Sequence, residues 1–208
     1  MFAVVESGSI TSMPQGNKGI KIGDYNYPPT IFTLWSESER NAIGVYTVEI
    51  DNTNFKSQEW YINTDITYAF SGGKVTGSYG TATAKAHADT LWTEQDKTDG
   101  LISPGKDVGD VAVEGLKTKL IRTVKIQAEG ILNVTDWYIT RKAEKSTAIP
   151  SAITTYRDAV RTKQASMCTA IANASDTPAL ETLYTYVNTA DEGEPVVMER
   201  PLGELPTL

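Results

Sequence analysis

The sequence between Asp110 and Asn173 constrains the fold most, because it holds two long runs in which apolar residues recur with helical spacing. In the second run, Ile153, Val160 and Met167 recur every seven residues, as on one face of an α-helix. The first run mixes apolar and basic residues: Val113, Leu116, Lys117, Lys119, Leu120, Arg122, Val124, Lys125 and Ile131. We therefore expect two amphipathic helices, the first with a cationic outer face, whose apolar faces pack on each other or on a partner.

Trp137 and Tyr138 follow the predicted end of the first helix, between Gly130 and Asn133. Thr135 or Asp136 can cap the helix that follows, because short polar side chains accept hydrogen bonds from the first free N–H groups. The indole ring of Trp137 is then expected to lie between the two long helices and to separate them.

A third helix is predicted after Asn173, with Thr177 as its N-cap and Pro178 as its first residue. Its inward face is expected to consist of Leu180, Leu183, Tyr184 and Val187. Three prolines between Asp191 and Leu208 then indicate an extended tail, docked only where a neighbouring protein receives it.

The N-terminal part, residues 1–85, shows the alternating patterns and glycine turns of β-strands. Strands are expected at 2–5, around Ile10, and at 18–22, 45–50, 60–62, 66–70 and 74–79. The first two are expected to form a hairpin, as are the last two, and the strands between 45 and 79 are expected to form a meander with open edges. Ser36 followed by Glu39 forms a capping box and predicts a short helix from Glu37 to Ile43, closed by Gly44 in the left-handed conformation.

The fold class predicted from these patterns is α+β. An N-terminal antiparallel β domain (1–85) is followed by a connector (86–109), in which a strand around Thr90–Thr93 fits the sequence. A helical module of three helices (110–190) and the extended tail (191–208) complete the chain.

The overall composition excludes several classes of function. The chain has 208 residues, of which 40% are hydrophobic, and a net charge of −7, which argues against a non-specific nucleic-acid surface. Cys168 is the only cysteine, so an intrachain disulfide is excluded. The opening residues lack a signal-peptide pattern, and no apolar run approaches the roughly 20 residues of a membrane span, so neither export nor membrane insertion is expected.

The sequence offers few groups for catalysis. His87 is the only histidine and lies in an alanine-rich stretch, so no Ser-His-Asp or zinc-binding pattern is apparent. The segment 100–107 has the glycine and lysine spacing of a phosphate-binding loop. It ends in Asp107, where the magnesium-binding Ser or Thr belongs, and it contains Pro104. We therefore predict no catalytic residue, no metal and no cofactor, and a protein that is not an enzyme.

Several short segments are similar to tail proteins of tailed bacteriophages that are associated with tail-fibre assembly. In the C-terminal half these segments are Thr135-Asp136-Trp137-Tyr138, Arg141-Lys142-Ala143-Glu144, Ile149-Pro150 and Tyr156-Arg157-Asp158-Ala159-Val160-Arg161. In the N-terminal half they are Phe2-Ala3-Val4-Val5-Glu6, Tyr27-Pro28-Pro29 and the stretch from Trp35 to Gly44.

The resemblance implies a non-enzymatic protein that binds the tail fibre or another tail or baseplate protein. It would act either as a structural subunit of the virion or as a fibre-assembly chaperone in the host cytoplasm. Homo-oligomers are compatible with it, whereas nucleic-acid binding and membrane insertion are not expected. Trp137, Tyr156, Arg157 and Arg161 are the partner-binding candidates that it implies.

Two alternatives remain open. Arg157 and Arg161 lie one helical turn apart, and the local charges favour their pairing within the chain, with Asp136 or Glu144, over pairing with a partner's carboxylates. For function, a carbohydrate-binding receptor module built on the N-terminal domain is the first alternative, and a small hydrolase dependent on His87 is the second.

Overall fold

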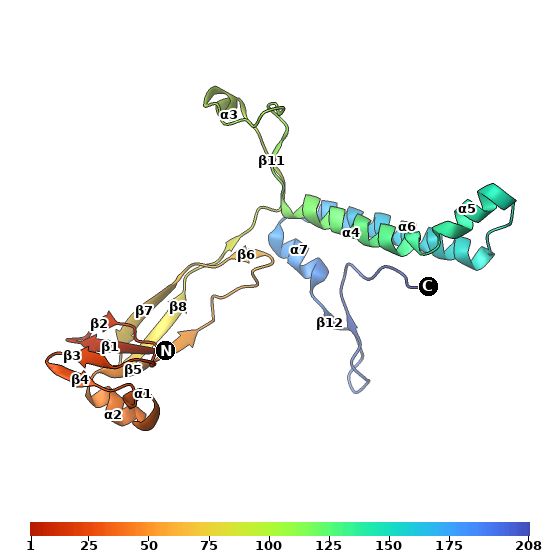
Figure 1. The fold of residues 1–208 in the computed structure, drawn as a ribbon. Helices are drawn as coiled ribbons and strands as arrows, with labels where there is room; N and C mark the ends of the chain where they lie inside the picture. Colours follow the sequence, from red (N-terminus) through yellow and green to blue (C-terminus); the bar gives the residue numbers. More distant parts are fainter. The chain divides into compact units, whose positions relative to one another are not determined.

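The computed structural model describes residues 1–208, and its fold is α+β, as predicted (Figure 1). The chain divides into two compact units, unit 1 (Met1–Thr83) and unit 2 (Ala84–Leu208). Strands dominate unit 1 and helices dominate unit 2.

Unit 1 is built on a five-stranded sheet with the strand order β2-β1-β5-β8-β7. The strands are β1 (Phe2–Glu6), β2 (Ser9–Ser12), β5 (Val45–Asp51), β7 (Ile66–Ser71) and β8 (Lys74–Tyr79). A hairpin of β3 (Ile20–Ile22) and β4 (Tyr25–Tyr27) and the two-residue strands β6 (Tyr61–Ile62) and β9 (Thr83–Ala84) lie outside this sheet.

The sheet is mixed, so the predicted antiparallel meander is wrong. β8 pairs with β5 in parallel and with β7 antiparallel, which inserts β8 between two strands that precede it in sequence. The edge strands β2 and β7 also approach each other. Curling of the sheet therefore brings together the two edges that a flat meander would leave open.

The core of unit 1 lies on both sides of β1, because successive side chains of a strand point to opposite faces. Val4 packs with Ile31, Phe32 and Val45 on one face. Ala3, Val5 and Val75 form the cluster on the other face. This two-sided burial explains why β1 is apolar at consecutive positions instead of alternating.

Two short helices, α1 (Ile31–Leu34) and α2 (Glu37–Ala42), connect β4 to β5. The predicted capping box is confirmed: the Ser36 hydroxyl accepts from the Glu39 N–H, and the Glu39 carboxylate accepts from the Ser36 N–H at 2.7 Å. Gly44 has the predicted positive φ of 80°, and a Cβ there would lie 2.6 Å from the carbonyl oxygen of Val5. Glycine is therefore required at this turn.

Unit 2 contains one short helix, four longer helices and two small hairpins. The helices are α3 (Glu94–Thr98), α4 (Leu116–Asn133), α5 (Asp136–Lys145), α6 (Ser151–Asn173) and α7 (Thr177–Tyr184). The hairpins are β10 (Thr90–Leu91) with β11 (Val111–Val113), and β12 (Val187–Asn188) with β13 (Met198–Glu199).

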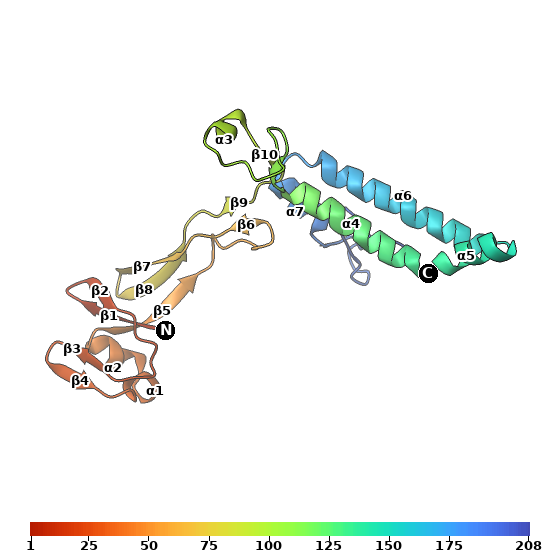
Figure 2. The ribbon, with the colours of Figure 1, turned by 45° about the horizontal axis from the view of Figure 1, so that its top comes forward.

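The two long helices α4 and α6 pack side by side and antiparallel (Figure 2). The buried residues of the predicted stripes are Val124 on α4 and Val160, Met167 and Ile171 on α6, and Ala128 of α4 is buried as well. Neither these nor the other helices combine the length and apolar composition needed to cross a bilayer.

The predicted module of three helices contains four, because the residues after Asn133 form the additional helix α5. The first helix begins at Leu116 instead of Val113, since Val113 belongs to β11 and Gly115 is the N-cap. The N-cap of α7 is Asp176, not Thr177: its carboxylate accepts from the Ala179 N–H at 2.8 Å.

Thr177 and the tail serve contacts within unit 2. The Thr177 hydroxyl donates to the carbonyl of Lys85 at 2.6 Å. The tail, expected to be extended, supplies the turn and strand β13 of the β12–β13 hairpin. It then returns to the helices, where Leu202 is buried and donates its N–H to the carbonyl of Leu183 at 3.0 Å. Apolar burial within unit 2 therefore anchors the tail without a neighbour.

Candidate protein interaction surface

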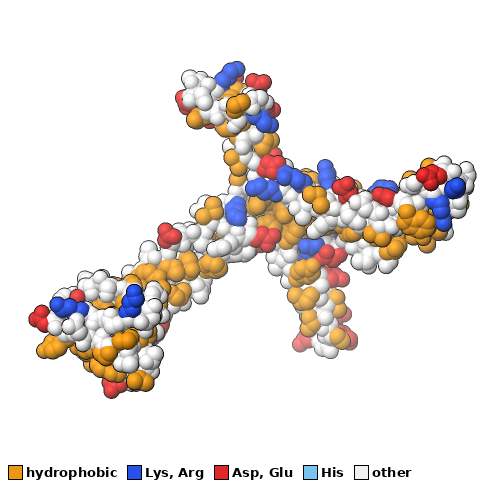
Figure 3. Space-filling view, in the orientation of Figure 1, with side chains coloured by type: hydrophobic (Ala, Val, Ile, Leu, Met, Phe, Trp, Pro, Cys, Tyr) orange, Lys and Arg blue, Asp and Glu red, His pale blue; other side chains and the backbone are white.

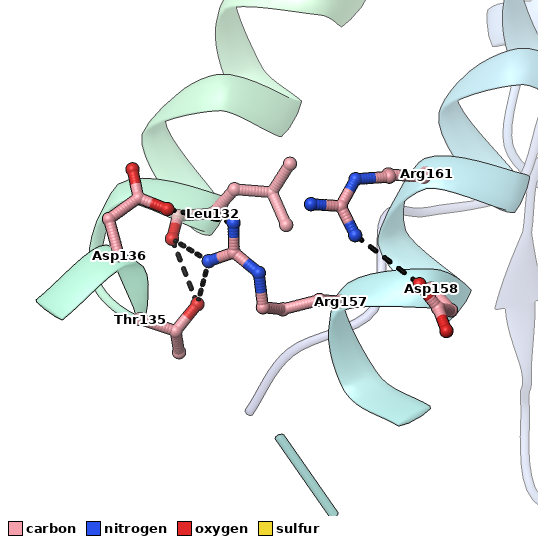
Figure 4. Close-up of polar contacts among 6 residues, drawn as sticks. All are labelled: Leu132, Thr135, Asp136, Arg157, Asp158 and Arg161. Carbon is pink, nitrogen blue, oxygen red and sulfur yellow. Dashed lines mark hydrogen bonds and ion pairs between the residues drawn. The ribbon is translucent and has the colours of Figure 1, made fainter. Parts of the chain in front are cut away.

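Helices α4, α5 and α6 form the helical arm (residues 116–173), which carries all four sequence-predicted partner-binding residues. Arg157 connects the helices of this arm through polar contacts (Figure 4). Its Nη1 donates to the Leu132 carbonyl at 2.9 Å and to the Thr135 hydroxyl at 2.5 Å, and its Nη2 lies 2.8 Å from the Asp136 carboxylate. One guanidinium thus joins α6 to the end of α4 and the start of α5.

The sequence explains why an arginine is needed at this position. The last carbonyls of α4 have no partner within the helix, and a positive charge is favourable at a helix C-terminus. Arg157 supplies both the donor and the charge, and the Thr135 hydroxyl adds a 2.9 Å bond to the Leu132 carbonyl. The planar guanidinium can reach three acceptors at once, which an ammonium group cannot do in this geometry.

Arg157 is therefore paired within the chain, and the predicted pairing with Asp136 is confirmed. Its side chain is only 8% exposed, so a partner cannot reach it directly. The role of Thr135 was not predicted from the sequence: it is 1% exposed, and its hydroxyl accepts a hydrogen bond from Arg157. Its position directly after the end of a long helix could have indicated a contact with the last carbonyl groups of that helix.

Arg161 lies one turn further along α6 and differs from Arg157 in its surroundings. Its side chain is 52% exposed and pairs only with Asp158 of the same helix, at 3.3 Å. Such an exposed pair contributes at most about 1 kcal/mol. Arg161 is thus free to exchange this carboxylate for one from another molecule.

A polar cleft of ≈ 460 Å³ lies beside these two arginines, between α4 and α6. It is lined by Lys125, Ala128, Glu129, Leu132, Asn133, Asp136, Arg157, Arg161 and Gln164. The lining residues carry three cations, Lys125, Arg157 and Arg161, against two carboxylates, Glu129 and Asp136. Arg157 pairs with Asp136, and Arg161 pairs with Asp158, which lies outside the lining. The cleft therefore favours an anionic group from outside.

Trp137 does not lie between the long helices, so the prediction that it separates them is wrong. It belongs to α5, and its side chain is half exposed. Its ring stacks on Tyr138 with centroids 3.8 Å apart, and the Arg141 guanidinium lies 4.7 Å from the Trp137 ring centroid. The adjacent Ile139 is 43% exposed, so the start of α5 presents a mixed aromatic and aliphatic surface.

Tyr156 has a structural position. It is partly buried, and its hydroxyl donates to the carbonyl of Pro206 at 3.5 Å. The four predicted residues thus separate into two pairs: Tyr156 and Arg157 make contacts inside the unit, whereas Trp137 and Arg161 offer exposed groups.

The weak candidates for chemistry make structural contacts. His87 gives its backbone carbonyl to the Lys117 N–H, and the Cys168 thiol accepts from the Gln164 side chain at 3.2 Å. The loop that resembles a phosphate-binding loop leads into strand β11, whereas a phosphate-binding loop requires a helix there. No group of three His, Cys, Asp or Glu residues is placed to hold a metal ion.

Comparison with family models, curated proteins and solved structures finds no match to this chain.

Proposed function

We propose that this chain is a non-enzymatic tail protein of a tailed bacteriophage that binds the tail fibre. It acts as a structural adaptor of the virion or as a fibre-assembly chaperone. The tail-fibre assignment is motivated by the sequence resemblance. The main support for a binding role is the large accessible surface area of the chain.

The accessible surface of the chain is 13428 Å². Two separate compact units of about 9 and 14 kDa would together expose only about 11,400 Å². The excess of about 2,000 Å² is larger than the roughly 800 Å² that one partner contributes to a standard protein interface. This excess of exposed surface supports the proposal that the chain buries part of its surface by binding another protein.

The exposed start of α5 is the best candidate for the fibre contact. Tryptophan, tyrosine and arginine dominate the binding energy of protein interfaces, and Trp137, Tyr138 and Arg141 are stacked together there. The half-exposed indole already has its rotamer fixed by this stack, so binding would cost little side-chain entropy.

Co-purification with a trimeric tail fibre tests the proposal. We expect the wild type to be retained on the fibre and Trp137→Ala to lose at least about 10-fold in affinity with an unchanged melting temperature. Tyr25→Ala removes another exposed aromatic ring, in unit 1, and serves as the control. Equal retention of all three proteins, or of none, would overturn the proposal.

Mass spectrometry of purified particles separates the two forms of the proposal. An adaptor remains in the mature virion in a fixed ratio to the fibre. A chaperone is present in infected cells but missing from particles.

Carbohydrate binding by unit 1 is a second candidate, favoured by one cavity. This cavity, of ≈ 430 Å³, is lined by Phe55, Gln58, Asn63, Thr64, Asp65, Ile66, Tyr68 and Tyr79. The rings of Phe55 and Tyr79 lie 5.0 Å apart, and aromatic rings beside amides and carboxylates suit a sugar. A host glycan that binds the wild type but not Tyr79→Ala would favour this function over fibre binding.

A further inference from the structure

Charge is strongly segregated along the chain. The helical arm carries ten lysines and arginines against four acidic residues, a net charge of +6 in a protein whose total is −7. The last 35 residues, 174–208, carry seven acidic residues against one arginine, a net charge of −6. Figure 3 shows this contrast: blue side chains follow the arm, and red side chains lie among orange ones on the C-terminal hairpin.

The C-terminal hairpin (residues 187–199) carries the acidic groups at its tip and apolar groups on its strands. Its strands pair Val187 with Glu199 and Asn188 with Met198, and Asp191, Glu192 and Glu194 form the turn. Its exposed apolar side chains are Val187 at 48%, Val196 at 70%, Val197 at 46% and Met198 at 52%.

The base of this hairpin is fixed in place. The Tyr186 hydroxyl donates to the Glu204 carboxylate, which also pairs with Arg200 at 2.7 Å. The Arg200 guanidinium lies 5.6 Å from the Tyr186 ring centroid. The two strands beyond this base have no third strand or helix against their valines, although an isolated two-stranded hairpin is only marginally stable in water. A covering surface would therefore stabilise the hairpin.

The polar cleft of the arm has the complementary features. Lys125 and Arg161 stand at its rim, and the buried Arg157 holds α4, α5 and α6 in register around it. Its facing carboxylates are Glu129, Asp136, which is paired with Arg157, and Asp158, which holds Arg161 only weakly. Ile126 of α4 and Val134, which directly follows α4, are 59% and 67% exposed, so the arm also offers apolar surface outside the cleft.

We propose that the cleft receives the acidic tip of the C-terminal hairpin from a second copy of this chain, so that two chains exchange hairpins in a symmetric dimer. Charge complementarity selects this occupant: the chain carries both the acidic apolar hairpin and the cationic cleft. In a dimer with a two-fold axis, the contact between hairpin and cleft occurs twice, so both hairpins and both clefts are occupied.

The total charge of −7 does not prevent this association. Charges further apart than the Debye length of about 8 Å at physiological salt are largely screened. The pairs that form between the hairpin tip and the rim of the cleft are in contact and are screened much less. Local complementarity therefore outweighs the repulsion between the whole molecules, and the dimer is expected to weaken as salt rises.

A charge exchange tests the proposal in the full chain, with light scattering and sedimentation as readouts. The tip variant Glu192→Lys with Glu194→Lys and the cleft variant Lys125→Glu with Arg161→Glu should each be monomeric, with a dissociation constant raised at least about 100-fold. Mixing the two variants should restore a dimer, because both contacts of the mixed pair then join opposite charges. This rescue also shows that both variants are folded.

Two control pairs carry the same charge changes on exposed residues of unit 1: Asp24→Lys with Glu59→Lys, and Lys18→Glu with Lys21→Glu. Both controls should dimerise like the wild type. A wild type that stays monomeric, a dimer that survives both reversals, or variants that fail to combine would overturn the proposal. A monomer that still binds the fibre through Trp137 would overturn only this inference and leave the proposed function intact.

Discussion

At the scale of single residues, Arg157 decides the geometry of the arm. Its three acceptors belong to the end of α4, the segment between the helices and the start of α5. A buried donor or acceptor that loses its partner costs roughly 1–3 kcal/mol, so this side chain contributes more through the groups it satisfies than through its charge.

Arg157→Lys is expected to lower the free energy of unfolding by about 1–3 kcal/mol, because an ammonium group cannot serve all three acceptors. Urea unfolding followed by far-UV circular dichroism measures this, since most helix belongs to unit 2. Arg161→Lys, on the exposed side of the same helix, should change stability by less than about 0.5 kcal/mol. Equal effects of the two substitutions would contradict the assigned role.

Glu39 provides a prediction about pH. Hydrogen bonds from the Ser36 hydroxyl and the Ser36 N–H hold the pKa of the Glu39 carboxyl below its ordinary value. A depressed carboxyl pKa in the folded state stabilises the protein above the ordinary pKa, and this contribution is lost as the pH falls through the folded value.

Ser36→Ala removes the larger of these two effects, so the pKa of Glu39 should rise toward its ordinary value. The variant should also lose less stability than the wild type on acidification. A carboxyl titration followed by NMR measures the first effect directly. Ser38→Ala, on the same helix, is the control, and a Glu39 pKa that does not respond to Ser36→Ala would refute the capping box.

At the scale of elements, local sequence patterns were sufficient to predict those features that depend on residues close together in the sequence. The capping box at Ser36 and Glu39 and the apolar stripes of α4 and α6 were predictable, because each depends on residues within a few turns. The insertion of β8 beside β5 was not predictable, since strand order depends on pairing between distant segments.

The same difference between local and distant interactions explains which features of the interaction surface could be predicted from the sequence. Pairing of Arg157 with Asp136 followed from nearby opposite charges, and it was predicted. The exposed position of Trp137 was not, because it depends on whether the residues after Asn133 continue as a helix. The C-terminal hairpin was also missed, since its strands have only two residues each and Pro195 and Pro201 flank β13, which makes the tail look extended.

Two glycines of the α4 segment should respond oppositely to alanine. A Cβ at Gly130 meets nothing within 4 Å, so Gly130→Ala should stabilise the helix by about 0.5–1 kcal/mol. A Cβ at Gly115 would lie 2.3 Å from the backbone of Ala88, so Gly115→Ala should destabilise the protein by about 1–3 kcal/mol. Thermal unfolding measures both, and shifts in the same direction would contradict the packing of α4.

At the scale of the whole molecule, the chain exposes more surface than its two units need. Exposed apolar and aromatic side chains occur at the start of α5 and on the C-terminal hairpin, and opposite charges are concentrated on the arm and the tail. Both features are typical of a protein whose surfaces are completed by binding.

We propose that another protein covers the start of α5, and hydroxyl-radical footprinting of Trp137 tests this proposal most directly. Trp137 should be labelled rapidly in the free chain, because it is 50% exposed, and protected when the tail fibre is added. Trp60, which is 4% exposed, should be labelled slowly in both states. Labelling of Trp137 that stays unchanged in the presence of saturating fibre would contradict the account.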